Sequence, residues 1–267
     1  MNQIALHCSS FVGQQAGYQP PSDWGRAVRA LADYYRPPET FASRFERLIL
    51  RVRALGYAAM DVWQAGQLDW QWATGGQIRA AAELLARHGM AATSLAGEFG
   101  STREEFQAAC RAAVGIGAPL LSGLTGLWFS DPAFVLRTLK ENNLKLALEN
   151  HPETTAQEML AEIGGRGEGL VGTALDTGWY ATRGFDVVRA VRELGERILH
   201  VHLKDVLPGG GHVNCGYGRG IVPLREVVGA LKEQGYPGVY SVEEHTLDHD
   251  PDEELRADRI LVQGWLA

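Results

Sequence analysis

Four residues that can bind a cation or transfer a proton stand at the ends of four successive apolar stretches of the sequence. They are Glu149 in "KLALE", Asp176 in "VGTALD", His202 in "ILHVH" and Glu243 in "GVYSVE". A carboxylate at the end of a buried apolar segment costs free energy unless a partner compensates for its charge. Three carboxylates and one imidazole suit Mn²⁺ or Mg²⁺, and Co²⁺ or Zn²⁺ less distinctively. We therefore predict that these four side chains bind one divalent metal ion.

The alternation of side chains along a strand supports one common orientation for the four residues. Residues two positions apart point to the same side, so an inward Glu149 places Ala147 inward and an inward Glu243 places Ser241 inward. The residues then expected to face outward are all apolar: Leu146, Leu148, Leu199, Val201, Tyr240 and Val242. A structural hydrogen-bond network is the alternative, and a single strand-end glutamate would favour it. Four such residues at one depth favour the metal site.

Short apolar runs alternate with longer amphipathic runs along the whole sequence. The predicted strands cover residues 3–6, 58–62, 91–95, 119–123, 145–149, 171–176, 198–202 and 238–243. The predicted helices cover residues 41–56, 76–89, 102–117, 132–143, 155–165, 185–195, 223–235 and 251–266. Eight strand–helix pairs in about 250 residues predict an α/β fold, a closed (β/α)8 TIM barrel. We expect a single domain over residues 1–267. An open doubly wound sheet is the alternative, but "LHCSSFVGQQAG" is a poor phosphate loop after the first strand.

Capping signals mark several of these boundaries. Thr102 with Glu105, and Thr155 with Glu158, fit the capping-box pattern at two helix starts. Asp250 precedes a proline at the start of the last helix, and glycines 56, 89, 195 and 235 stand where helices should end. Residues 18–40 are expected to form a long first loop that holds one short helix.

Composition excludes several classes of protein. The formal net charge is −7 and the isoelectric point about 5.6, whereas a nucleic-acid-binding protein usually has a basic face. The cysteines Cys8, Cys110 and Cys215 lack the spacing of a disulfide framework or zinc site, which favours a reducing cytoplasm. The N-terminus lacks the features of a signal peptide, and no apolar run reaches the length of a membrane span. We expect a cytoplasmic protein with neither nucleic acid nor membrane as partner.

Polar and aromatic residues close to the strand ends are candidate substrate contacts. His151 could contact a substrate or cap the next helix. Lys204 could bind a substrate oxygen or phosphate, or form a salt bridge across the barrel rim. His245 shares the parity of Glu243 but could already belong to a loop. Trp179 is the best placed of five loop tryptophans to stack on a sugar ring; the alternatives are loop packing and a subunit interface, which leaves a homo-oligomer open.

The remaining histidines receive weaker assignments. His200 has the inward parity of His202 one layer lower, and we expect a core residue that orients a ligand. His7 ends the first strand and is a minor candidate for the pocket. The residues expected on the surface or in loops are His88, His212 and His249.

Several of these motifs resemble one superfamily. "LALENHP", "ALDTGW", "ILHVHLKDV", "YSVEEH" and "GYGRGIVPLREVVGALKEQGYPGVYSVE" resemble the xylose isomerase-like barrels. That superfamily contains sugar (phosphate) isomerases and epimerases, including ketose 3-epimerases and hydroxypyruvate isomerase, together with inosose dehydratase and the endonuclease acting on abasic DNA. The resemblance implies that the four residues named first bind a divalent metal, and that Glu149 and Glu243 act as an acid–base pair.

The sequence departs from the superfamily pattern at two places. Trp179 stands where the family often has a histidine, and "KDVLPG" replaces the segment in which ketose 3-epimerases carry an arginine. Arg219, further along, is the candidate substrate-binding residue in its stead. The third and fourth strands end without the extra histidines of the abasic-site endonuclease, so that activity is not expected.

These observations lead to one expected activity and two alternatives. We expect a divalent-metal-dependent isomerase or epimerase of a small keto-sugar, polyol or sugar phosphate. Glu149 and Glu243 would transfer a proton through an enediolate that the metal stabilises. A dehydratase of the inosose type could use the same residues, and a sugar-binding protein could retain the metal without turnover.

Overall fold

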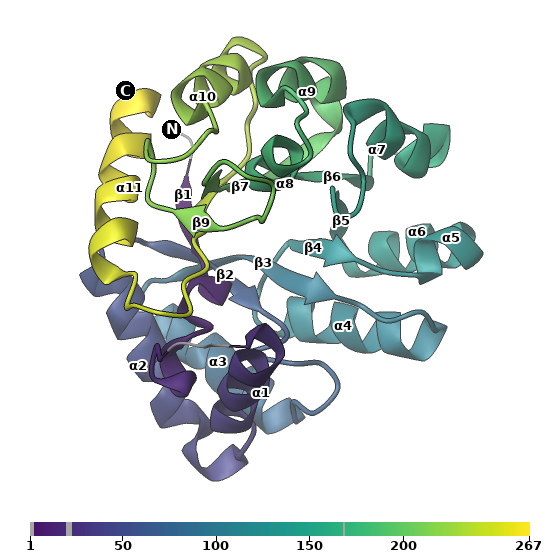
Figure 1. Ribbon diagram of the computed structural model, residues 1–267. Helices are drawn as coiled ribbons and strands as arrows, with labels where there is room; N and C mark the ends of the chain where they lie inside the picture. The colour runs from purple at the N-terminus through teal and green to yellow at the C-terminus, as the bar shows by residue number, and fades with distance from the viewer. Residues whose placement is uncertain (1–2, 20–22, 168) are drawn as a thin grey trace.

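The computed structural model describes residues 3–19, 23–167 and 169–267, which form a closed barrel of parallel strands (Figure 1). Neighbouring strands follow the order β1-β10-β7-β6-β5-β4-β3-β2. Their bounds are β1 (Ile4–His7), β2 (Ala59–Trp63), β3 (Ala91–Glu98), β4 (Leu120–Leu124), β5 (Lys145–Glu149), β6 (Val171–Asp176), β7 (Ile198–Leu203) and β10 (Tyr240–Val242). The pairing of β1 with β10 closes the barrel. The predicted single-domain TIM barrel is therefore confirmed, and the open sheet is wrong.

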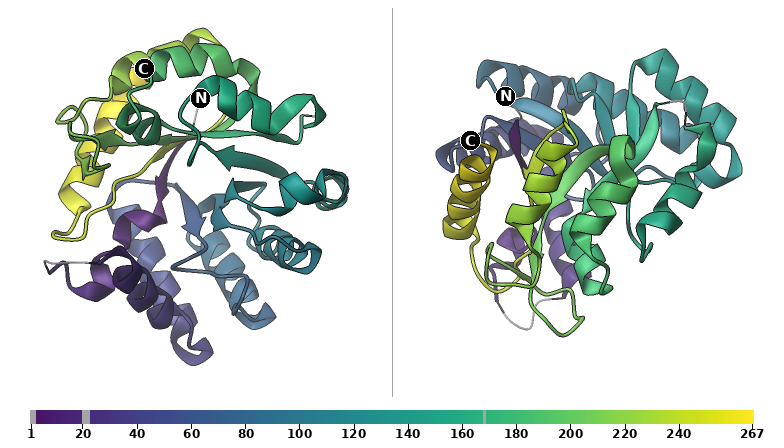
Figure 2. Two further views of the ribbon diagram at one scale, coloured as in Figure 1. Left: turned by 45° about the vertical axis from the view of Figure 1, so that its right-hand side comes forward. Right: turned by 90° about the horizontal axis from the view of Figure 1, so that it is seen from above.

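Helices surround the strands on the outside, as the further views also show (Figure 2). The helices that follow the eight barrel strands are α2 (Pro38–Ala54), α3 (Gly75–Arg87), α4 (Arg103–Gly115), α6 (Pro132–Asn142), α7 (Ala156–Ile163), α9 (Val187–Leu194), α10 (Leu224–Glu233) and α11 (Asp252–Leu266). The predicted long first loop holds α1 (Trp24–Tyr35); its residues 20–22 lie outside the described part of the chain. Within the described residues, no helix combines the length and the apolar character that a membrane span requires.

Short elements that periodicity does not reveal lie between barrel strands and helices. They are α5 (Leu127–Ser130), α8 (Thr177–Thr182), the two-stranded sheet of β8 (Asp205–Val206) and β9 (Asn214–Cys215), and the 3-10 helices η1 (Cys8–Phe11), η2 (Gln14–Ala16), η3 (Gly164–Arg166) and η4 (Gly195–Arg197). Each is too short to carry a helical or strand repeat in sequence. Several lie at the end of the barrel where the strands finish, so they shape the site.

The helix boundaries follow the predicted capping chemistry. Both predicted capping boxes are present, at Thr102 and Thr155, and a third begins at Thr74. The glycines at positions 56, 89, 195 and 235 all have positive φ, the conformation that ends a helix most cheaply at glycine. The last helix begins at Asp252, one residue later than expected. The backbone N–H of Asp252 donates a hydrogen bond to Asp250 Oδ1 at 3.1 Å.

The side chains inside the barrel differ from the prediction at one position. Leu120, Ala147 and Ala174 form a small inner core, and Leu199 packs against them instead of facing outward. The register between β6 and β7 shifts at Thr173, so the strand bulges at this point. The predicted outward orientation of Leu199 is wrong because a bulge breaks the alternation on which it rested.

A buried polar group occupies the middle of the barrel. Asp61 of β2 is fully buried. It accepts hydrogen bonds from the hydroxyls of Thr93 (2.6 Å), Ser94 (2.7 Å) and Ser241, and its Oδ2 lies 2.9 Å from His200 Nε2. Burial alone would raise the pKa of Asp61, but His200 outweighs it and holds this pKa well below its usual range. His200 is thus a core histidine, as predicted, although its partner is Asp61 and not one of the four strand-end residues.

Candidate active site

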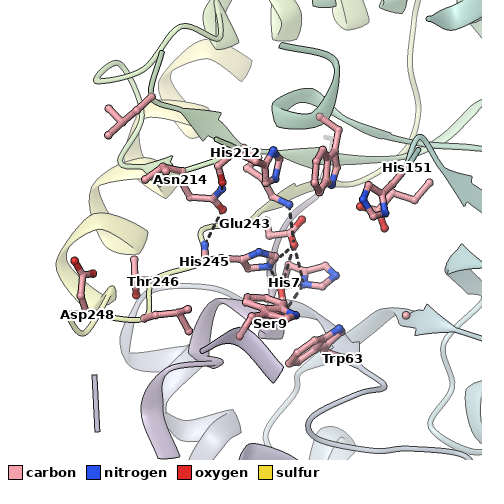
Figure 3. Close-up of a pocket in the computed structure, with 18 of the residues that line it drawn as sticks. His7, Ser9, Trp63, His151, His212, Asn214, Glu243, His245, Thr246 and Asp248 are labelled. Carbon is pink, nitrogen blue, oxygen red and sulfur yellow. Dashed lines mark hydrogen bonds and ion pairs between the residues drawn. The ribbon is translucent and has the colours of Figure 1, made fainter. Parts of the chain in front are cut away.

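The four strand-end residues lie together at the carboxyl end of the barrel, next to a cavity of about 860 Å³. Figure 3 shows residues that line this cavity, Glu243 among them. Glu149 ends β5, Asp176 ends β6 and His202 lies in β7. Glu243 follows β10 by one residue, and its backbone N–H still donates to Leu203 O at 3.0 Å. Glu149 and Glu243 line the cavity, whereas Asp176 and His202 are buried beneath it.

Distances among three of these side chains fit a shared cation, and Glu243 lies beside His202. Donor atoms of Glu149, Asp176 and His202 lie within 4.8 Å of one another. The Nδ1 atom of His202 lies 3.7 Å from Glu149 Oε1 and 3.5 Å from Glu243 Oε2. Among the described residues, His202 Nδ1 and Glu243 Oε2 are buried and have no hydrogen-bond partner. Buried polar atoms without partners are costly, and a cation between them would satisfy both.

A second group of possible ligands is less suitable. His7, Asp61 and His202 also have donor atoms within 4.8 Å of one another. However, the Asp61 oxygens already have four partners within the barrel. His202 Nδ1 lies near both Glu149 and Glu243 Oε2, which favours the Glu149, Asp176 and His202 group.

Lys204, directly after β7, forms a buried bridge between two of the carboxylates. Its Nζ lies 2.7 Å from Asp176 Oδ2 and 3.3 Å from Glu243 Oε1, and the residue is only 1% exposed. Burial alone would lower the pKa of Lys204, but Asp176, Glu243 and Glu149 together raise it above its usual value. The salt-bridge alternative is therefore present in the structure, although Lys204 also lines the cavity.

Gly178 gives the Lys204 stem its space. A Cβ atom at this position would lie 2.9 Å from Lys204 Cδ and 3.0 Å from its Cγ. We expect Gly178→Ala to lower the free energy of unfolding by about 1–3 kcal/mol, the usual cost of overpacking. Gly229→Ala, in α10 with open space around the new Cβ, should instead stabilise by about 0.5–1 kcal/mol. Urea denaturation of both variants checks the prediction; equal shifts would contradict it.

Glu243 lies at the centre of a cluster of donors from three strand ends. Its Oε1 accepts a hydrogen bond from Ser9 Oγ at 3.1 Å and lies 2.7 Å from His245 Nε2. His7 Nδ1 lies 3.7 Å away, and Figure 3 shows His7 and His245 on the same side of this carboxylate. Burial alone would raise the pKa of Glu243, but His7, Lys204 and His245 hold it well below its usual range. Glu243 is therefore ionised at neutral pH.

Glu149 and His202 stabilise each other's charges. Burial opposes both charges, but the interaction with His202 lowers the pKa of Glu149 to about 2. Glu149 and Glu243 likewise outweigh the burial of His202 and raise its pKa to about 9. In this arrangement the two glutamates are carboxylates and His202 carries a proton, which a cation bound at His202 Nδ1 would replace.

Asn150 holds the backbone of Asp176 in place. Its side chain accepts a hydrogen bond from Asp176 N at 2.7 Å and donates one to Asp176 O at 3.0 Å. Asp176 Oδ1 in turn accepts from Trp179 N at 2.9 Å and so caps α8. Burial raises the pKa of Asp176, although Lys204 opposes this effect. Sequence reasoning missed Asn150, which lies directly after Glu149.

Two histidines cover the ring of Trp179. Its ring centroid lies 3.6 Å from that of His212, with an interplanar angle of 8°, and 4.1 Å from that of His151. All three residues line the cavity, as predicted for His151 and Trp179. His212 lies in a loop, as predicted, but it also lines the cavity: its Nδ1 lies 2.9 Å from Thr182 Oγ1, and burial lowers its pKa to about 3. The indole has little free face left for a sugar.

The structure brings His245 to the cavity but not Arg219. The Arg219 side chain is 71% exposed and lies 3.7 Å from Glu254, outside the cavity lining. The placement therefore does not support Arg219 as a substrate-binding residue. Cavity residues that sequence reasoning missed or ranked low are His7, Ser9, Trp24, Trp63 and Asn214.

One carboxylate, Asp205, organises the long segment after β7. Its oxygens accept hydrogen bonds from four backbone N–H groups, those of Val206 (2.9 Å), Gly218 (2.9 Å), Gly220 (3.0 Å) and Val222 (3.1 Å). The segment between these anchors contains His212 and Asn214, and it projects from one end of the barrel in Figure 2. Asn214 Oδ1 accepts from His245 N at 2.9 Å, which ties this segment to the loop after β10.

Two buried acids behind this segment predict a pH-dependent stability. Burial raises the pKa of Asp258 to about 7 and that of Glu244 to about 8. Because these pKa values exceed those of the unfolded chain, the folded state keeps the protons after the unfolded chain has lost them, and stability falls progressively from about pH 4 to about pH 8. Asp258→Asn mimics the protonated acid, so its stabilisation relative to the native protein should grow by about 2–3 kcal/mol between pH 5 and pH 8.5. Urea denaturation of both proteins at pH 5 and pH 8.5 gives their free energies of unfolding. The prediction is wrong if the difference between the two proteins is the same at both pH values.

Comparison with known protein families identifies the family of this chain. Residues 49–262 match the family model described as xylose isomerase-like TIM barrel. The chain therefore belongs to the xylose isomerase-like TIM barrel family. No curated protein sequence matches the chain significantly.

Solved structures of the same fold include sugar epimerases and a dehydratase. L-ribulose 3-epimerase has a TM-score of 0.72 at 18% identity, with 100% of this chain and 95% of that chain covered. The probable 3-DHS dehydratase AsbF of Bacillus anthracis has a TM-score of 0.70 at 14% identity, with 98% of both chains covered. A D-tagatose 3-epimerase-like protein has a TM-score of 0.62 at 18% identity, with 81% and 91% covered. At these identities the likeness establishes the fold alone.

Proposed function

We propose that this protein is a divalent-metal-dependent isomerase or epimerase of a small keto-sugar or polyol. The observation that carries the proposal is the pair of buried atoms His202 Nδ1 and Glu243 Oε2, which lie 3.5 Å apart, within reach of one cation, and make no hydrogen bond. The likeness to L-ribulose 3-epimerase supports the same class of reaction.

Glu149, Asp176, His202 and Glu243 would hold the metal. Oxygen-rich sites with one imidazole suit Mn²⁺ or Mg²⁺ best, with Co²⁺ and Zn²⁺ as less distinctive choices. When bound, such an ion supplies Lewis-acid chemistry that polarises a carbonyl and stabilises an enediolate. Lys204 already places one positive charge between Asp176 and Glu243, so the site is built to hold positive charge among carboxylates.

Glu149 and Glu243 would transfer the proton. Both line the cavity and both are ionised at neutral pH, so each can accept a proton from a substrate carbon. Ser9 and His245 fix the orientation of Glu243 through its Oε1. The Glu149 side chain is 22% exposed, which allows its proton to exchange with solvent. Return of the proton to the opposite face gives an epimer, and return to the neighbouring carbon gives an isomer.

A dehydratase is the second candidate. The likeness to the probable 3-DHS dehydratase covers nearly the whole of both chains. The same carboxylates could remove a proton next to a carbonyl, after which a β-hydroxyl would leave. Incorporation of solvent deuterium without loss of water distinguishes the epimerase from this alternative.

The test is incubation of the Mn²⁺-loaded protein with a panel of ketoses, aldoses and inososes in D₂O. NMR should show deuterium at one carbon together with a new epimer or isomer, and a chelator should remove this activity. An unsaturated or deoxy product would instead indicate the dehydratase. Binding by calorimetry without any exchange or product would refute an enzyme and leave a sugar-binding protein.

We further place the protein in the cytoplasm, without nucleic acid as partner. Cys8, Cys110 and Cys215 are all free thiols, which suits a reducing compartment. The described residues that line the cavity include one lysine and no arginine, a poor surface for a phosphate backbone. Light scattering would decide whether the protein is a homo-oligomer.

A further inference from the structure

The outer part of the cavity carries apolar side chains that are exposed to solvent. Trp24 of α1 is 41% exposed, and Leu207 and Val213, on the segment after β7, are 40% and 55% exposed. All three line the same cavity as the proposed catalytic glutamates. Large apolar side chains that gather at the surface indicate a binding surface, whereas isolated ones need no explanation. We call these three residues the apolar rim.

The apolar rim is held in place by contacts within the chain. Leu207 follows β8 and Val213 precedes β9, and Leu207 N donates to Val213 O at 2.8 Å, directly beyond the paired residues of the two strands. The Trp24 ring lies 4.8 Å from the ring of His245 and 6.0 Å from that of Trp63. Because these contacts fix the rim before a ligand arrives, a ligand does not have to order it.

The charges of the cavity disfavour a phosphate group. Its described lining includes the carboxylates Glu149, Glu243 and Asp248, a single lysine and no arginine. That lysine, Lys204, is already paired with two carboxylates. Phosphates are usually bound by arginine, lysine or a free helix N-terminus, and the α8 N-terminus is capped by Asp176. A phosphate dianion would therefore enter a site with excess negative charge.

The size of the cavity exceeds the need of a monosaccharide. Its volume of about 860 Å³ lies in the upper part of the range of about 300–1,000 Å³ that holds drug-sized ligands. The hydrogen-bonded cluster around Glu243 occupies only part of the cavity, as Figure 3 shows. A small sugar bound there would leave the apolar rim uncovered.

We propose that the substrate is an unphosphorylated sugar or polyol that carries an apolar or aromatic substituent, and that this substituent packs on Trp24, Leu207 and Val213. This inference rests on the proposed function, because the sugar part is placed at Glu149 and Glu243. It narrows the proposed substrates to sugars and polyols that lack a phosphate group and carry an apolar group.

Calorimetric binding of three glucose derivatives tests the proposal without turnover. We expect phenyl β-D-glucopyranoside to bind at least tenfold more tightly than methyl β-D-glucopyranoside, and glucose 6-phosphate to bind more weakly than either. This order should hold both with Mn²⁺ and with a chelator, since the rim lies outside the proposed ligand set. Equal affinity of the two glycosides, absent binding of the phenyl glycoside, or tighter binding of the phosphate would overturn the proposal.

Matched variants connect the preference to the rim. Val213→Ser and Leu207→Ser should each reduce the preference for the phenyl glycoside several-fold. Ile260→Ser, on α11 at the same 55% exposure as Val213 but outside the cavity lining, should leave it unchanged. If the rim variants instead alter the oligomeric state and leave the preference intact, the rim is a subunit interface and the proposal is wrong. A failure of the proposed isomerase or epimerase activity gives a different result. The protein would then show no deuterium exchange with any sugar of the panel, while it still preferred the phenyl glycoside in the binding experiment.

Discussion

Replacing Glu243 by glutamine is expected to lower kcat by about 10²–10⁴-fold, the usual contribution of a general acid–base residue. Glutamine keeps the shape of the side chain and can still accept a hydrogen bond from Ser9, but it cannot take a proton from carbon. The rate of deuterium exchange at the substrate carbon, measured by NMR with the substrate that the panel identifies, should fall with kcat. Substrate binding, measured by calorimetry, should be largely retained.

Glu244→Gln is the matched control for this experiment. Glu244 is adjacent in sequence and equally buried, but it is outside the cavity lining. Its raised pKa of about 8 means that it is mostly protonated at neutral pH, so glutamine resembles its native form. Activity should change little in this variant. Surviving exchange in Glu243→Gln would remove the acid–base role from Glu243.

Replacing Lys204 by methionine should lower the free energy of unfolding of the metal-free protein by about 3–5 kcal/mol, the cost of breaking a buried ion pair from one side. Methionine fills the space of the stem but leaves Asp176 and Glu243 without their shared cation. Urea denaturation in the presence of a chelator measures the loss. Lys140→Met, on the exposed end of α6, should change stability by less than about 0.5 kcal/mol.

Addition of Mn²⁺ should restore more stability to Lys204→Met than to the native protein. A ligand that binds the folded state at 100 times its Kd stabilises it by about 2.7 kcal/mol, and the variant binds the cation at a site with one positive charge fewer. The thermal midpoint with and without Mn²⁺ gives this difference. Unchanged midpoints in both proteins would show that these carboxylates do not hold a metal.

Sequence reasoning located the barrel and the four converging residues because both depend on local signals. A polar residue at the end of an apolar run is visible in one stretch of sequence, and barrel topology brings such ends together. Ser9 and Asn150 carry no such signal. Ser9 reaches Glu243 across 234 positions of sequence only because β1 lies beside β10, and Asn150 acts through the backbone of Asp176.

The errors arise where the regular pattern is interrupted. Leu199 faces the barrel interior because β7 is bulged at its start. His212 does lie in a loop, but its place in the cavity lining could not be predicted, because it depends on stacking against Trp179. Arg219 follows the same segment but points to solvent near Glu254. Loop conformations of this kind are set by contacts distant in sequence, which no local pattern records.

The four backbone hydrogen bonds of Asp205 fix both ends of the segment that contains Leu207 and His212. Residues 208–213 lie between those ends and outside the four proposed metal ligands. If the apolar rim selects the substrate as proposed, exchange of this stretch would change the molecule that binds while Glu149 and Glu243 keep their positions. A laboratory library randomised over these six positions should yield mostly folded variants that differ in what they accept.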